Sequence, residues 1–337
     1  MSGDPQTASG VSTPGQSLGT EPVVISTTPP GDAGRTEKGK SWLLWPSVVP
    51  LLLWMIVPLA MTIYFSFIHY SIFQQVSPWP PDFAGFDNYL FLIGDPSFVT
   101  AIINTLLFIG VVLIISVVAG VLLAILYDLD FFGHNVAMLF VIAPFFVMPP
   151  VSVLVWKNLL MDPVNGLFSV WTHNFNAVLG FLHLDALQIA PIDWFADYPL
   201  MSVIIIVAWE WIPFAFLILI TSLKSLDQEQ REAASIDGAG PLAQFFYIVL
   251  PHLMRAITVV VMIETIFLLG IFAEIYASTK GGPGDATTTL TYLVYLLGLS
   301  QGNYGVASAG GILAVILANI VSFFLVRTLA KNLSSTR

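Results

Sequence analysis

Six uninterrupted apolar stretches constrain this chain more than any other feature of its sequence. They run over about residues 43–68, 99–127, 136–160, 200–223, 256–276 and 305–329. The hydrocarbon core of a bilayer is ~30 Å thick and one helical crossing takes about 20 apolar residues, so each stretch is long enough to span it. Because 56% of the residues are apolar and only 9% are charged, a water-soluble enzyme core is excluded. The sequence therefore predicts an all-α membrane protein with six transmembrane helices.

The basic residues predict which side of the lipid bilayer each connection faces. Six spans return the C-terminus to the side of the N-terminus, and nine of the eleven Lys and Arg residues then lie on that side. Basic residues are enriched on the cytoplasmic side of membranes, so we expect both termini in the cytoplasm. Residues 1–40 are rich in Pro, Gly, Ser and Thr, which predicts a disordered cytoplasmic tail before a transmembrane domain over residues 41–337.

The longest polar stretch on the predicted cytoplasmic side covers residues 224–252. Asp227 with Gln230 has the spacing of a capping pair, which predicts a short helix that runs to about Ile236. Gly238 follows at the position where a glycine commonly ends a helix. The pattern thus predicts a short helix and a tight turn outside the membrane.

Two prolines frame a second short helix in the same stretch. Pro241 suits a first helical turn, and we expect Pro251 to end this helix before the fifth span begins. An ordinary amphipathic loop is the alternative interpretation of the stretch.

Several residues of this segment match a family motif at its ungapped spacing: Glu232, Ala233, Ala234, Asp237, Gly238, Ala239, Phe245, Ile248, Leu250 and Pro251. The pattern resembles the EAA motif of bacterial binding-protein-dependent ABC importer permeases. In that family the segment is the coupling helix, which docks into a groove on a separate ATPase subunit. The resemblance assigns this ATPase-coupling role to Glu232, Ala233, Ala234, Asp237, Gly238 and Ala239, and the small residues among them permit close backbone approach.

The resemblance extends over about residues 41–333. It also rests on Asn104-Thr105-Leu106, Pro144, Trp156, Gly281-Gly282-Pro283, Thr287, Leu290 and Tyr295. These motifs resemble carbohydrate-uptake permeases, in particular the maltose-permease-like partner of their heterodimers. The stretches 287–295 and 307–333 are most similar to permeases for sugar alcohols such as mannitol and sorbitol. Arg255 departs from the pattern, because many relatives have a proline there.

The resemblance implies a fold, a location and a set of partners. The fold is that of a type I ABC importer permease, with six transmembrane helices and a cytoplasmic coupling helix, in the bacterial cytoplasmic membrane. The implied partners are a second homologous permease subunit, two ABC ATPase subunits, a periplasmic or extracellular solute-binding protein, and a small carbohydrate or polyol.

Other chemistry has no support in the sequence. The chain has no Gly-x-x-x-x-Gly-Lys-Ser/Thr loop, so we expect ATP and Mg on the partner ATPase subunits and no cofactor on this chain. The five histidines lack metal-ligand spacing, and we identify no metal site and no catalytic constellation. The net charge of −10 disfavours binding to nucleic acid.

Two acidic residues, Glu210 and Glu264, lie near the middle of the fourth and fifth predicted spans. A charge at the bilayer centre costs ~2.5–3.5 kcal/mol on insertion scales, so such residues are candidates for function, and we expect these two at similar depth. Carboxylates accept hydrogen bonds from sugar hydroxyls, and aromatic rings pack on the C–H faces of sugars. The resemblance to the maltose permease and this chemistry together give the candidate substrate-pathway residues Trp209, Glu210, Trp211, Phe214, Glu264, Leu268 and Ile271.

Several alternatives remain at this stage. Leu268 and Ile271 stand where the maltose permease has polar side chains, which indicates a drier or smaller site or a different ligand. The two glutamates could instead make internal hydrogen bonds to neighbouring helices, and we expect Glu274 to reach the membrane interface. An ion-coupled secondary transporter that uses the intramembrane glutamates, or a membrane enzyme that uses them as acid and base, is a rival function.

Overall fold

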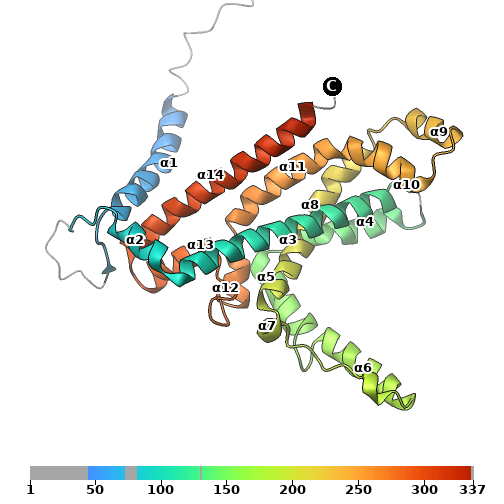
Figure 1. The fold of residues 1–337 in the computed structure, drawn as a ribbon, viewed down its shortest axis with the longest axis horizontal. Helices are drawn as coiled ribbons and strands as arrows, with labels where there is room; N and C mark the ends of the chain where they lie inside the picture. The colour runs from blue at the N-terminus through green and yellow to red at the C-terminus, as the bar shows by residue number, and fades with distance from the viewer. Residues whose placement is uncertain (1–44, 73–81, 130, 335–337) are drawn as a thin grey trace, which may run out of the picture. The chain divides into compact units, whose positions relative to one another are not determined.

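The computed structural model describes residues 45–72, 82–129 and 131–334, and within these ranges the chain is helical, with two isolated β-bridges and no strand. The predicted tail at residues 1–40 lies outside the described residues. The α-helices in Figure 1 are α1 (Trp45–Ser66), α2 (Asp87–Gly94), α3 (Pro96–Leu126), α4 (His134–Ile142), α5 (Pro149–Val155), α6 (Leu167–Phe181), α7 (Trp194–Asp197), α8 (Pro199–Leu223), α9 (Gln228–Ile236), α10 (Pro241–Gln244), α11 (Leu250–Leu269), α12 (Ala273–Ser278), α13 (Leu290–Tyr295) and α14 (Tyr304–Ser334).

The described residues contain five helices that are long and apolar enough to cross a membrane, and up to six if one bent pair forms a single crossing. The five are Trp45–Ser66, Pro96–Leu126, Pro199–Leu223, Pro241–Leu269 and Tyr304–Phe324. The expected all-helical membrane fold is therefore confirmed. The described residues fall into two units with a boundary between Met55 and Ile56, and the packing described below is that of the second unit.

The third predicted span, residues 136–160, is broken rather than continuous. It consists of His134–Phe146 and Pro149–Leu160, which are bent by 110° relative to one another. Val147 and Met148 between them have extended backbone, with ψ of 134° at both residues. The two prolines Pro149 and Pro150 explain the break, because a proline disfavours helical backbone at the preceding residue.

The fifth predicted span, residues 256–276, is shifted in the structure. One helix runs without interruption from Pro241 to Leu269, so the expectation that Pro251 ends a helix is wrong. A π-helical turn, Phe245–Val249, ends two residues before that proline and changes the hydrogen-bond pattern of the helix there. Pro251 therefore falls in the first turn of the regular α-helical part, α11, where proline is tolerated. The span then ends earlier than expected, and the chain resumes as α12.

The long helices α3 and α8 pack closely along one another (Figure 1). At Gly120 of α3, a Cβ atom would lie 2.8 Å from Cβ of Ala215 on α8, so only glycine fits this contact. Small residues at helix crossings let backbones approach in membranes, where lipid gives no hydrophobic drive for association. Two apolar clusters flank the crossing. The buried members of the first are Phe108, Ile109, Val112, Val203, Ile204, Val207, Ala208, Leu268, Ile271, Ile275 and Tyr292. Those of the second are Val121, Ala124, Tyr127, Ala215, Phe216, Leu219, Ile220, Leu223, Leu253, Ala256 and Val260.

Two sequence motifs that are distant in the chain contact each other. Asn104 Nδ2 on α3 donates to the backbone oxygens of Asp285 at 2.9 Å and Thr288 at 3.1 Å. The backbone N–H of Leu290 donates to Thr105 Oγ1 at 2.9 Å. These bonds hold the loop between α12 and α13 against α3. The motif at residues 104–106 and the motif at residues 281–295 therefore have a structural role.

Candidate functional site

The predicted segment at residues 224–252 contains a helical hairpin, formed by α9, a tight turn and α10. The side chain of Asp227 caps α9 by accepting a hydrogen bond from the backbone N–H of Glu229 at 3.0 Å. The expected capping pair with Gln230 is wrong in detail, because Gln230 donates its backbone N–H to the backbone oxygen of Asp227 at 3.2 Å. The predicted helix itself is confirmed, with its end at Ile236.

The turn of the hairpin is built around Gly238, whose φ of +85° is a left-handed conformation that favours glycine. Gly238 N–H donates to Ser235 O at 3.1 Å, and Ala239 N–H donates to Ala234 O at 2.9 Å. These two bonds form a Schellman motif and confirm the predicted stop. Gln244 of α10 ties the hairpin together, because its Nε2 donates to Ser235 Oγ at 2.9 Å and to Ala239 O at 3.0 Å.

The hairpin presents its surface to the outside of the described fold. No side chain of α9, which is described throughout, is buried. The six candidate coupling residues all lie on α9 and its turn, half-buried or exposed: Glu232, Ala233, Ala234, Asp237, Gly238 and Ala239. Nearby Ile236 is 86% exposed and Leu242 is 75% exposed. Exposed apolar side chains beside polar ones are typical of an interaction surface.

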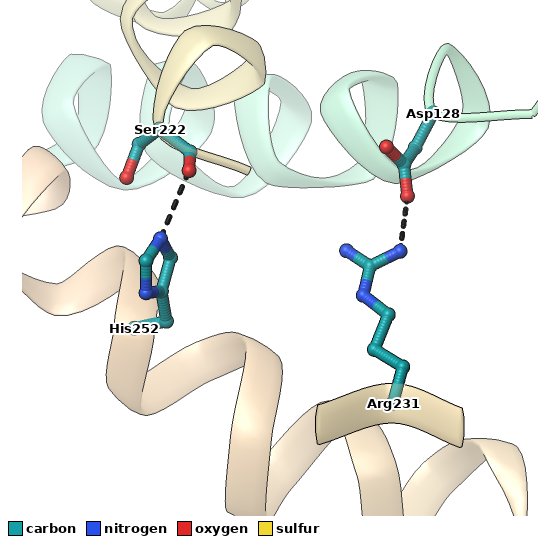
Figure 2. Close-up of polar contacts among 4 residues, drawn as sticks. All are labelled: Asp128, Ser222, Arg231 and His252. Atoms are coloured by element: carbon teal, nitrogen blue, oxygen red, sulfur yellow. Dashed lines mark hydrogen bonds and ion pairs between the residues drawn. The ribbon is translucent and has the colours of Figure 1, made fainter. Parts of the chain in front are cut away.

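Figure 2 shows two polar contacts near the hairpin, of which the first holds α9 to the bundle and the second joins α11 to α8. Arg231 Nη1 of α9 pairs with Asp128 Oδ2, just beyond the end of α3, at 2.5 Å. His252 Nε2 at the start of α11 lies 2.9 Å from the backbone oxygen of Ser222 near the end of α8. The first pair joins residues 103 positions apart in the sequence, so no local pattern could reveal it.

Glu264 on α11 is fully buried and bonded to a neighbouring helix. Its Oε2 accepts a hydrogen bond from Ser116 Oγ of α3 at 2.5 Å. This contact matches the internal hydrogen bond that the sequence left open as an alternative. Its second oxygen, Oε1, is buried and has no hydrogen-bond partner among the described residues. Glu264 thus retains one free acceptor inside the bundle.

Glu210 on α8 has different neighbours from Glu264. Its carboxyl group interacts with the hydroxyl of Ser152 on α5 and with the carboxyl of Glu274 on α12. Glu274 is only 7% exposed, so its side chain lies within the helical bundle, and the expectation that it reaches the membrane interface stays a prediction. The break after α11 turns Glu274 back towards α5 and α8, which the sequence pattern did not indicate. Glu210 Oε1 is likewise buried without a hydrogen-bond partner in the described part of the chain.

The candidate aromatic residues of α8 separate into two groups. Trp211 and Phe214 are 5.8 Å apart between ring centroids, and Phe145 lies 6.1 Å from the first and 5.9 Å from the second. Trp209 instead meets Trp156, with centroids 5.7 Å apart. The structure therefore brings Trp211 and Phe214 together and places Trp209 in a separate contact.

The other two candidates, Leu268 and Ile271, are core residues in this conformation. They are 1% and 7% exposed and belong to the apolar cluster that includes Phe108 and Val207. Trp211 packs against the same cluster. Their contact with a ligand stays a prediction.

The sequence did not predict an aromatic group formed by Phe272, which precedes α12, and residues of α12 and α13. Phe272, Tyr276, Tyr292 and Tyr295 are mutually packed, with 4.9 Å between the ring centroids of Phe272 and Tyr295. Tyr276 is 44% exposed. The sequence spacing could have indicated this group. Phe272 and Tyr276 are four residues apart and Tyr292 and Tyr295 are three apart, and residues at these spacings share a helix face. No cluster of His, Cys, Asp and Glu suited to a metal ion occurs among the described residues.

Comparison with known proteins identifies close relatives in sequence. The probable ABC transporter permease protein y4oQ of Sinorhizobium fredii is 32% identical over 297 residues, which cover 88% of this chain and 91% of that protein. The trehalose/maltose transport system permease protein MalF of Thermococcus litoralis is 29% identical over 286 residues, which cover 84% and 90%.

A solved structure shows the same fold. A chain in the crystal structure of a bacterial alginate ABC transporter, in complex with an alginate pentasaccharide-bound periplasmic protein, superposes with a TM-score of 0.64 at 22% identity. The match covers 86% of this chain and 96% of that chain. Residues 116–335 match the family model of binding-protein-dependent transport system inner membrane components. With more than half of its length matched, this multi-pass membrane protein belongs to the family of binding-protein-dependent transport system inner membrane components.

Proposed function

We propose that this chain is the permease subunit of an ATP-driven ABC importer that takes up a sugar or sugar alcohol from a solute-binding protein. The observation that carries the proposal is the exposed α9–α10 hairpin at one end of α8 and α11 (Figure 1). It connects the two helices that bear Glu210 and Glu264, the acidic candidates for contact with a solute. A force on the hairpin therefore acts on both helices.

The hairpin surface supports docking of an ATPase subunit. Glu232 and Ala233 are exposed beside the apolar side chains of Ile236 and Leu242, a mixture suited to a protein partner. We propose that this chain and a second, homologous permease each engage one of two ATPases, which bind ATP and Mg. The hairpin then faces the cytoplasm, in agreement with the basic residues at both predicted cytoplasmic ends and with inner-membrane localisation.

The transport cycle follows from this connection. Closure of the ATPases on ATP displaces the hairpin and tilts α8 and α11, which opens the path between the permeases to the solute-binding protein. Hydrolysis reverses the tilt and opens the path to the cytoplasm. The solute leaves chemically unchanged, because the chain only binds and releases it.

The substrate proposal rests on the chemistry of the candidate pathway. Glu210 and Glu264 each have a buried carboxyl oxygen without a hydrogen-bond partner among the described residues, and sugar or polyol hydroxyls are suitable donors. Trp211 and Phe214 offer aromatic faces for C–H groups. The relative from Thermococcus litoralis is a trehalose/maltose permease, which supports a carbohydrate; the narrower sugar-alcohol assignment rests on the stretches 287–295 and 307–333.

Substitution of Gly238 tests this function. Asp at a φ of +85° strains the turn and adds a charge to the surface proposed to dock the ATPase. In proteoliposomes that hold both permeases and the ATPases, Gly238→Asp should reduce ATP-dependent uptake at least about tenfold and abolish ATPase stimulation by the loaded binding protein.

The matched control is Gly85→Asp, which places the same residue at a φ of +53° in the turn before α2. It should assemble and transport normally. Stimulated ATPase activity in the Gly238→Asp complex would reject the coupling role. Uptake that proceeds without ATP would instead favour a secondary transporter, and an altered solute would favour an enzyme.

A further inference from the structure

Helix α9 depends on few contacts for its position. None of its side chains is buried, so apolar packing does not fix it against the bundle. Ser235 joins it to α10 through Gln244, which stabilises the hairpin internally. The ion pair of Arg231 with Asp128 is the side-chain link from α9 to the end of α3 (Figure 2).

The partner of Arg231 lies on a firmly packed corner. Asp128 follows Tyr127, which is 5% exposed. The ring of Tyr127 packs against Phe216 of α8 with centroids 5.2 Å apart, and against His134 at the start of α4, also at 5.2 Å. A pull on Asp128 is therefore transmitted to α3, α4 and α8 together.

The surroundings make this pair stronger than an ordinary surface ion pair. Both side chains are 22% exposed, and Arg231 Nε is buried without another partner in the described part of the chain. The pair borders a hollow whose other walls are mostly apolar, with Leu122, Ile125 and Leu129 on one side and Pro241, Leu242 and Phe245 on the other. Apolar surroundings lower the local dielectric and weaken screening by salt, so attraction between the charges is stronger than in water.

We propose that the Asp128–Arg231 pair is a positioning clamp that makes α3 move with the hairpin during transport. This inference rests on the proposed coupling function and extends it from the two connected helices to a third. The contact of His252 with Ser222 joins α11 to α8, the two helices that the hairpin connects. The pair stays closed throughout the cycle, so that displacement of α9 carries α3, α8 and α11 as one body.

Charge reversal tests the clamp. In the reconstituted importer, Asp128→Arg and Arg231→Asp should each lower solute uptake per ATP hydrolysed by about tenfold, because like charges push α9 off the corner. The double variant restores an attractive pair and should return this ratio to within about twofold of wild type. Arg255→Asp, which removes a positive charge from an exposed side chain of α11, is the matched control and should leave the ratio unchanged.

Rescue by the double variant shows that the two charges act as a pair. Because uptake per ATP is measured on assembled complexes only, a pair needed only for folding would leave this ratio unchanged in the single variants. Equal ratios in wild type and both single variants would overturn the clamp while leaving the importer function intact. Absence of ATP-dependent uptake by the wild-type complex would instead reject the proposed function itself. Assembly of each complex is checked by co-purification of the ATPase subunits, and the uptake ratio is measured on assembled complexes only.

Cross-linking distinguishes a clamp that stays closed from one that opens. The chain has no native cysteine, so Asp128→Cys with Arg231→Cys gives a single pair of reactive thiols. A short bis-maleimide that joins them should leave most of the uptake seen in the same double variant before cross-linking. Loss of uptake on cross-linking would show that the pair must separate during transport and would overturn the proposal.

Discussion

Among the described residues, the carboxyl group of Glu264 is bonded at one oxygen only, to Ser116 of α3. A buried acceptor without a donor costs about 1–3 kcal/mol. A ligand hydroxyl that donates to this oxygen would therefore gain more than the same hydroxyl in water. Glu210 on α8 also has a buried carboxyl oxygen without a partner in the described part of the chain, which supports the proposal of a solute with several hydroxyl groups.

Replacement of each glutamate separates ligand binding from internal packing. Glu264→Leu and Glu210→Leu should each lower uptake about tenfold or more without loss of assembly, since a buried hydroxyl that loses its hydrogen-bond partner costs about 1–3 kcal/mol. Ser116→Ala is the control, because it removes only the internal bond of Glu264, and should lower uptake less than about threefold. Wild-type uptake by both Leu variants, or equal losses in the Ser116 and Glu264 variants, would favour a packing role.

Among the elements, α3 and α8 share the closest backbone approach described above, at Gly120. A side chain there would also meet the backbone nitrogen of Phe216 at 3.1 Å. Backbone atoms cannot move aside as a flexible side chain can, so the two helices would have to separate. The α3–α8 contact is thus fixed by a residue with no side chain.

A pair of glycines on one helix tests that contact. Gly120→Val should destabilise the protein by about 1–3 kcal/mol through overpacking, and the loss should appear as a lower midpoint in thermal unfolding in detergent. Gly110→Val is the matched control on α3, because a Cβ at this position meets nothing within 4 Å. Equal midpoints for the two variants would contradict the close packing.

Local chemistry explains which elements could be predicted from the sequence. The long apolar stretches, the cap at Asp227 and the stop at Gly238 depend on residues a few positions apart. The neighbours of Glu274 and the contact of Arg231 with Asp128 depend on how distant helices meet, and no periodicity encodes that. Pro251 misled the reasoning because the preceding π-helical turn, which has no simple sequence signal, lets the helix continue.

On the scale of the whole molecule, the matched family region at residues 116–335 contains the hairpin and the acidic candidates together. The chain ahead of it adds α1, α2 and the first part of α3. Residues 1–40 differ from both regions in composition, since they lack a long apolar stretch. The sequence thus predicts that assembly and transport depend on the region after the tail.

Truncation tests this division. Deletion of residues 1–38 should leave membrane insertion, co-purification with the ATPases and uptake within about twofold of wild type, because a segment that buries little apolar area contributes little to stability. Uptake and co-purification are compared at equal expression. Loss of complex assembly in the truncated protein would show that the tail takes part in an interface.

The 110° corner between residues 146 and 149 leaves irregular backbone within the third crossing. Hydrocarbon cannot hydrogen-bond to such peptide groups, so irregular backbone is tolerated only where protein covers it or where it lines a water-filled cavity. Phe145, next to the corner, stacks near Phe214 of the candidate pathway. The corner therefore has to be enclosed by protein, from this chain or from a partner, or to face water, so lipid is excluded from it.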